Sequence, residues 1–261
     1  MPRRRERFDR SDVPRESPYR NVIGAVVCVA ALAAVAAVVL FVYGRVQLES
    51  HLDDRDLSEA LSSQSAQNPT QGNGYAASTD AFENVLLYVA SGLDEGGSQL
   101  VSARVLSLNT TQGTAAIAGI PAIAKIDFEN PAALGDVYLS SGPAATVELL
   151  SDETGIVFDH VIVSTADVLG QLSALAAEGV VDPVSQAKEL VSQIMTDLEA
   201  SELVSLAGQV LSSGAAGIVA GEAPLVPETV AGADGAAVET GSQLVDATQL
   251  SLALGLLVPA V

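Results

Sequence analysis

A run of 22 residues without a charged side chain, from Val22 to Tyr43, constrains this chain more than any other feature of its sequence. A helix of that length spans roughly 33 Å, which is enough to cross the hydrocarbon core of a bilayer. A cleaved signal peptide is the main alternative, but its apolar region is only about 7–15 residues long and ends in a small-residue cleavage site. Because this run ends in "FVYGR", the sequence favours an uncleaved transmembrane signal anchor.

The basic residues indicate how this anchor is oriented. Seven arginines precede the run, and only Arg45 and Arg55 follow it closely. Since positive charge stays on the cytoplasmic side, residues 1–21 are expected to form a basic cytoplasmic tail, followed by the anchor at 22–43. The sequence therefore predicts a single-pass protein of the cell membrane whose long C-terminal part lies outside the cytoplasm and whose first partner is membrane lipid.

The part after Arg45 is strongly acidic. It holds 28 of the 32 acidic residues but only 4 of the 12 basic ones, a net charge of −24. Such a surface repels phosphates, so no nucleic-acid partner is expected. The only cysteine, Cys28, lies within the anchor, so no disulfide can stabilise the outer part. His51 and His160 are the only histidines, and no Cys/His cluster suggests zinc.

The outer part divides into a connector and a folded domain. Residues 44–81 read as an acidic stalk helix with leucines at helical spacing, then a Ser/Gln/Asn/Gly-rich flexible linker. Residues 82–261 alternate between expected strands and helices. Apolar strands are expected near 85–89, 100–109, 114–120 and 158–164, and helices near 143–155, 165–179, 182–195, 196–214 and 241–257. This pattern predicts an α/β fold in which helices flank a mostly buried central sheet.

No catalytic signature stands out. The loop "SGLDEGGS" lacks the spacing and the lysine of a phosphate-binding loop, and it reads as a strand connection. Asp159 and His160 are neighbours on an expected strand, so their side chains point to opposite faces and cannot act as one dyad. We therefore expect His160 to be structural.

Three stretches together resemble the LytR-CpsA-Psr (LCP) family. They are "NVLLYVASGLD", "TAAIAGIPAIAKI" and "TGIVFDHVIVSTADVLGQLSAL", and they occur in the family's order. The resemblance covers roughly residues 82–261 and implies a single LCP-like domain behind one transmembrane helix. It further implies an envelope protein, mostly of Gram-positive bacteria, related to phosphotransferases that move glycopolymers from a polyprenyl diphosphate carrier to peptidoglycan. In that family an apolar pocket holds the lipid, and arginines, aspartates and Mg²⁺ hold the diphosphate.

Several of these charged positions are missing here. The family's strand end reads Ile-Pro-Arg-Asp, whereas this chain has Ala122 and Ile123 after the matching Ile120 and Pro121. The family's aspartate near the start of the second strand is absent as well, because residues 98–101 are "SQLV". The charged residues that remain as candidates for a ligand pocket are Asp94, Arg104, Lys125 and Asp159.

Three interpretations stay open. The favoured one is a pseudoenzyme of cell wall biogenesis that binds a polyprenyl phosphate carrier, a wall glycopolymer or an active LCP relative. The second is an active but divergent glycopolymer phosphotransferase that uses Asp94, Arg104 and residues of a partner. The third is an anchored scaffold without a ligand. No cofactor is expected, and Mg²⁺ would be needed only if the family's activity is retained.

Overall fold

The structure is a computed structural model, and it describes residues 51–65, 74–94, 96–127, 129, 131–165, 193–212, 218–233 and 235–260. The predicted cytoplasmic tail, the anchor at 22–43, the expected helix at 165–179 and most of the one at 182–195 lie outside these ranges. Within the described ranges, none of the helices is long and apolar enough to cross a membrane.

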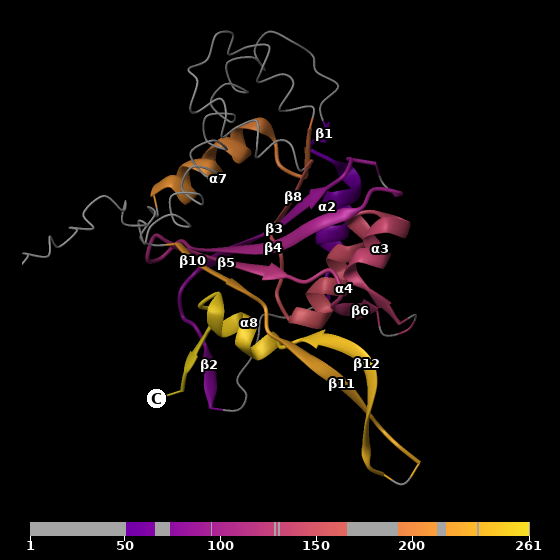
Figure 1. Cartoon of the computed structure of the whole chain (residues 1–261). Coiled ribbons are helices and arrows are strands. Elements are labelled where there is room, and N and C mark those ends of the chain that lie inside the picture. The colour runs from indigo at the N-terminus through magenta and orange to yellow at the C-terminus, as the bar shows by residue number, and fades with distance from the viewer. Residues whose placement is uncertain are drawn as a thin grey trace, which may run out of the picture.

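A mixed sheet of seven strands forms the centre of the fold (Figure 1). The antiparallel meander of β3 (Phe82–Ala90), β4 (Leu100–Asn109) and β5 (Thr114–Ile120) supplies three of its strands, and β8 (His160–Thr165) pairs parallel to β3 on the other side. Their long apolar runs explain why they lie centrally. In spatial order the strands are β1 (His51–Leu52), β9 (Ile194–Thr196), β8 (His160–Thr165), β3 (Phe82–Ala90), β4 (Leu100–Asn109), β5 (Thr114–Ile120) and β10 (Ile218–Glu222).

Helices cover both faces of this sheet. One face packs against α2 (Arg55–Ser63), α3 (Leu134–Ser141) and α4 (Ala144–Thr154), and the other packs against α7 (Ala200–Ser212). The predicted α/β architecture, a central sheet with flanking helices, is therefore confirmed. Alternation along the strands sorts the side chains, so Leu86 and Tyr88 face α4, while Val85 belongs to the cluster under α7.

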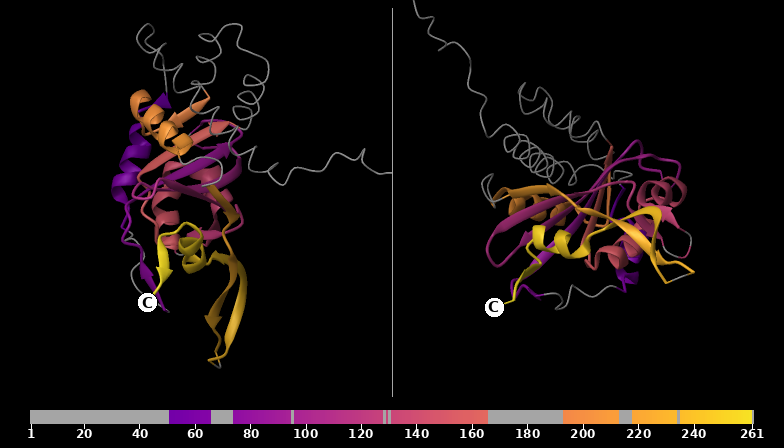
Figure 2. Two further views of the ribbon diagram at one scale, coloured as in Figure 1. Left: turned by 90° about the vertical axis from the view of Figure 1, so that its left-hand side faces the viewer. Right: turned by 60° about the horizontal axis from the view of Figure 1, so that its bottom comes forward.

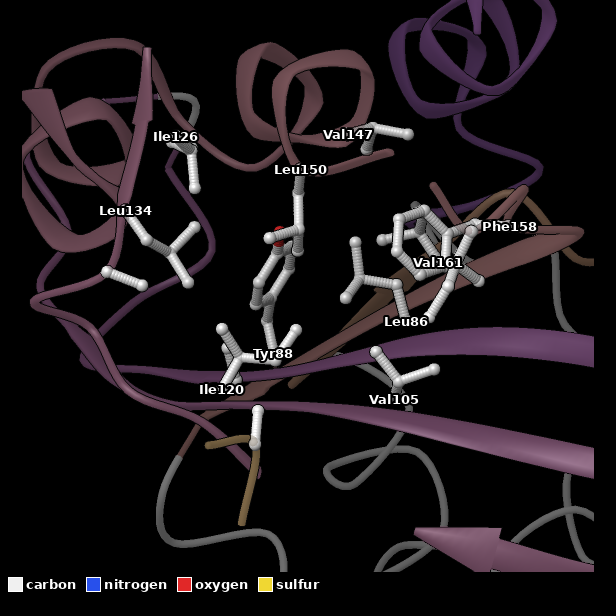
Figure 3. Close-up of a cluster of buried hydrophobic side chains, with 14 of the residues drawn as sticks. Leu86, Tyr88, Val105, Ile120, Ile126, Leu134, Val147, Leu150, Phe158 and Val161 are labelled. Carbon is white, nitrogen blue, oxygen red and sulfur yellow. The ribbon is translucent and has the colours of Figure 1, made fainter. Parts of the chain in front are cut away.

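The α4 face is tightly filled. Ten of its side chains interdigitate between sheet and helices (Figure 3), and each is at most 3% exposed. Tyr88 and Tyr138 meet edge to face, with ring centroids 5.2 Å apart. The Thr146 hydroxyl donates to the carbonyl of Pro143 (2.6 Å), so it accepts from the Tyr88 hydroxyl, 2.7 Å away. The ten residues are Leu86, Tyr88, Val105, Ile120, Ile126, Leu134, Val147, Leu150, Phe158 and Val161.

The helix expected as a stalk belongs to the folded domain instead. Leu57 on α2 is 1% exposed within the core, and the side-chain amide of Gln64 exchanges two 2.8 Å hydrogen bonds with the backbone of Phe158. Further along, β2 (Tyr75–Ala77) pairs with β13 (Leu257–Pro259). The folded part thus begins before Phe82, where the sequence pattern placed its start.

The C-terminal part holds a hairpin that the sequence did not predict and a shorter helix than expected. Its Gly- and Pro-rich stretch forms β11 (Leu225–Ala231) and β12 (Ala237–Val245), an antiparallel hairpin that projects from the body (Figure 2). Only α8 (Ala247–Ala253) remains of the helix expected over 241–257. A second small ladder joins β6 (Lys125–Asp127) to β7 (Ala132–Ala133).

The helix boundary near Thr196 is a further correction. Ile194–Thr196 is strand β9, not helix, and the Thr196 hydroxyl donates to the carbonyl of Val161 on β8. The first turn of α7 is closed by Glu202, whose carboxylate accepts from the backbone N–H of Glu199 at 3.0 Å. This segment forms a strand and not a helix because it pairs with β8 in the central sheet.

Candidate functional site

The resemblance places the candidate site at the sheet edge where β3, β5 and β8 end and β4 begins. The loop from Ser91 to Gln99 closes this edge with two reciprocal bonds: Ser91 N–H donates to the carbonyl of Gln99 (2.9 Å), and Gln99 N–H donates to the hydroxyl of Ser91 (2.8 Å). Gly97 N–H donates to the carbonyl of Leu139 (2.7 Å), which ties the loop to the end of α3. The edge is therefore a fixed part of the fold.

The end of β5 carries the two residues that stand in place of the family's arginine and aspartate. A turn follows Pro121, with Ala124 N–H donating to its carbonyl at 2.9 Å. The carbonyl of Ala122 accepts from Gly135 N–H at the start of α3, and the Ile123 side chain is 66% exposed. Neither side chain can bind an anion or move a proton, so this part of the edge offers no charged chemistry.

The four candidate pocket residues do not come together at this edge. Asp94 lies on the loop from Ser91 to Gln99, at this edge. Asp159 lies near the opposite edge, where its carboxylate accepts from Asn84 N–H at 2.7 Å. Asn84 precedes Ala90 by six residues on β3, a separation of about 20 Å along the strand. Arg104 is exposed in the middle of β4, on the α7 side, opposite Gly119.

Lys125, the fourth candidate, has a structural environment. It is 8% exposed on β6, and its ammonium pairs with the carboxylate of Glu228 on the hairpin at 2.5 Å. That hydrogen bond lowers the pKa of Glu228. The nearby Glu153 of α4 accepts from Val245 N–H at 3.0 Å, and burial raises its pKa to about 7. Where the β11–β12 hairpin meets the body, the single ammonium of Lys125 therefore acts on two carboxylates, those of Glu228 and Glu153.

A second charged group, which sequence reasoning missed in part, surrounds His160. Its Nδ1 lies 2.8 Å from the carboxylate of Asp197, and its Nε2 lies 3.7 Å from that of Glu83. The hydrogen bond with Asp197 raises the pKa of His160, against the opposing effect of burial. The other oxygen of Asp197 accepts from Val161 N–H at 2.7 Å. This geometry agrees with the expected structural role of His160. Its partner Asp197 lies 37 residues away in the chain, so no local sequence pattern could predict the pair.

Within the part of the chain that the structure describes, three or more Asp, Glu, His or Cys side chains nowhere gather in a way that could hold a metal ion. The charged groups described above serve strand pairing and hairpin attachment. Where β5 ends, the sheet edge presents the small and apolar side chains of Ala122 and Ile123.

Comparisons with known proteins give no match to any family model and none to any curated protein. Solved structures with a related arrangement include the Lin1025 protein of Listeria innocua, which is 12% identical with a TM-score of 0.46 over 67% of this chain and 98% of that one. TagV of Bacillus subtilis is 13% identical, with a TM-score of 0.45 over 68% and 96%. TagT bound to LI-WTA is 13% identical, with a TM-score of 0.43 over 74% and 98%.

Proposed function

We propose that this chain is a membrane-anchored protein on the outer face of a bacterial envelope, and that it assists cell wall assembly without catalysing transfer. The resemblance to the LCP family supports the envelope role. Its three stretches include β3, β5 and β8, which are strands of the same central sheet; β8 pairs with β3, and β4 lies between β3 and β5. The anchor remains a prediction from the uncharged run at 22–43.

The observation that carries the non-catalytic part is the uncharged edge at Ala122 and Ile123. Transfer from a diphosphate needs cationic donors and a metal to spread the charge that develops. The two cations nearest in sequence are used or placed elsewhere: Lys125 pairs with Glu228, and Arg104 lies mid-strand on the α7 side. The part of the chain after Arg45, with its net charge of −24, offers a diphosphate little other attraction.

We assign carrier binding to the α7 side of the sheet. The α4 side is occupied by its own side chains, as Figure 3 illustrates. On the α7 side, the partly buried Leu87 and Ile117 flank the strand that carries Arg104, their side chains packing on the cluster beneath α7. A polyprenyl chain needs only apolar surface, at about 25 cal/mol per Å² buried, and a single arginine suffices to pair with a monophosphate.

Two measurements on the full chain in mild detergent test the proposal. A transfer assay with polyprenyl-diphosphate-linked sugar, a peptidoglycan acceptor and Mg²⁺ should give no product above the no-protein control. Native mass spectrometry of the same preparation should show a co-purified or added polyprenyl phosphate, which Arg104→Ala weakens and Arg55→Ala does not.

Each outcome separates the interpretations. Turnover would refute the non-catalytic assignment and favour the divergent transferase. Absence of both turnover and lipid uptake would refute carrier binding and leave a scaffold. The full chain is required, because a fragment that starts after α2 would lose the buried Leu57.

A further inference from the structure

Three large apolar side chains lie exposed along the sheet edge described above. Ile123 after β5 is 66% exposed, Val101 at the start of β4 is 59% exposed, and Leu139 on α3 is 41% exposed. Hydrogen bonds connect their surroundings, because α3 binds Ala122 through its first turn and Gly97 through its last. We call these three residues the apolar edge. Contiguous exposed apolar patches mark contact sites, whereas singly exposed apolar residues are ordinary, so the position of the edge decides whether it makes a contact.

The sheet ladder shows on which side the chain enters the fold. His51, the first described residue, lies level with Ile120 of β5 in one row of paired residues across the sheet. β1 runs parallel to β9 and therefore antiparallel to β8. The backbone before His51 consequently leaves the sheet on the side where β8 ends and where β4 begins. The row is His51, Met195, Val163, Tyr88, Ala103 and Ile120.

The seven residues between the predicted anchor and β1 act as a tether, and their length limits how far β1 can lie from the membrane. Seven residues separate Tyr43, the end of the predicted anchor, from His51, so even fully extended they reach only about 25 Å. β1 and β5 are five strand spacings apart, about 24 Å. The opposite end of the sheet, at Phe82 of β3, lies six residues beyond the row of His51, or about 20 Å. The chain between the predicted anchor and β1 therefore enters on the side of the apolar edge, and the opposite end lies about 20 Å farther from that entry point.

We propose that the apolar edge rests on the bilayer, with Val101, Ile123 and Leu139 inserted at the headgroup level. The inference depends on the anchor of the proposed function. Since the outer part carries a charge of −24, anionic lipids do not attract it, and the contact is apolar. The occupant that fits is therefore a lipid surface rich in uncharged headgroups.

The β11–β12 hairpin supplies a matched control. Val238 on β12 is 50% exposed, near the 59% of Val101, but the hairpin projects from the end of the molecule away from β1 (Figure 1). The two positions share chemistry and exposure and differ in their distance from the proposed membrane contact.

The experiment uses the full chain in phosphatidylcholine nanodiscs. Cys28→Ala provides a cysteine-free background, and Ile123→Cys, Val101→Cys and Val238→Cys each receive an environment-sensitive fluorophore. Quenching by nitroxide-labelled lipid is compared with quenching by aqueous iodide. We expect the lipid quencher to act severalfold more strongly at positions 123 and 101 than at 238, and iodide to show the reverse order.

The other outcomes are equally decisive. If the chain stays in the disc but positions 101 and 123 are quenched by iodide as strongly as 238, the membrane contact is refuted while the anchor stands. Protection from both quenchers would refute it in favour of a protein cover. A chain that does not remain with the disc would overturn the anchor and the proposed function together.

Discussion

Glu153 should make the stability of the domain depend on pH in a direction unusual for a carboxylate. Its pKa rises from 4.5 to about 7 in the folded state, mainly because burial disfavours the charged form. The hydrogen bond from Val245 and the charge of Lys125 oppose this effect, and Glu228 adds to it. Below about pH 4.5 the carboxyl is protonated in both the folded and the unfolded state, so its burial does not reduce the free energy of unfolding. Above about pH 7 it is ionised in both, and the folded state bears the full penalty.

The size of this penalty follows from the shift. At 1.36 kcal/mol per pKa unit, a rise from 4.5 to about 7 corresponds to at most about 3 kcal/mol. The carboxyl is only half-buried, and solvent screening reduces the value, so we expect about 1–2 kcal/mol. Glu153→Gln removes the charge and keeps an oxygen that can accept from Val245 N–H. The variant should therefore be more stable than the parent at about pH 8 and equal to it near pH 4.5.

Thermal unfolding of the full chain in mild detergent, followed by near-ultraviolet circular dichroism of its tyrosines, measures this difference. For a domain of this size, 1–2 kcal/mol corresponds to a Tm increase of about 3–6 °C at pH 8. The exposed Asp152 on the same helix supplies the control, because Asp152→Asn should produce a change of similar size at both pH values. A gain from Glu153→Gln that is the same at both pH values would refute the reasoning.

Three further substitutions test the core and the second charged group. Asp197→Asn should destabilise the protein more at about pH 5 than at about pH 9. The raised pKa of His160 contributes stability that is complete below about 6.5 and lost as pH rises through the folded pKa; equal losses at both pH values would contradict this. Leu57→Ala should cost about 2–5 kcal/mol in the same unfolding assay if α2 is part of the core, whereas a stalk helix would lose almost nothing. Thr146→Val should cost about 1–3 kcal/mol, because it leaves the buried hydroxyl of Tyr88 unpaired, and Thr146→Ser should restore most of it.

Sequence patterns predicted the elements whose signals are local. β3, β5 and β8 contain short apolar runs, and β4 alternates in part between apolar and polar residues. The helix α4 ends where the sequence suggested, at Gly155, whose φ of 65° a residue with a side chain rarely adopts. β9 was missed because three residues cannot be distinguished from the end of a helical pattern. Its existence depends on pairing with β8 and β1.

The hairpin was missed for a different physical reason. Its Gly- and Pro-rich composition is typical of a loop, and a two-stranded hairpin is marginal by itself in water. Its base is held by residues far away in the chain, since Glu153 binds Val245 across 92 positions and Lys125 binds Glu228 across 103. Lys125 was a candidate for the ligand site, and no local pattern could show that a distant carboxylate would occupy it.

The same argument limits what restoring the two missing residues can achieve. Ala122→Arg and Ile123→Asp would return two charges to the end of β5, and the exposure of Ile123 makes its replacement tolerable. The start of β4 would still lack an acidic partner, since the exposed Val101 lies there. Lys125 would remain paired with Glu228. Because residues that act together in catalysis fail as a unit, the double variant should still show no transfer, and product formation would mean that the α7 side already holds the remaining groups.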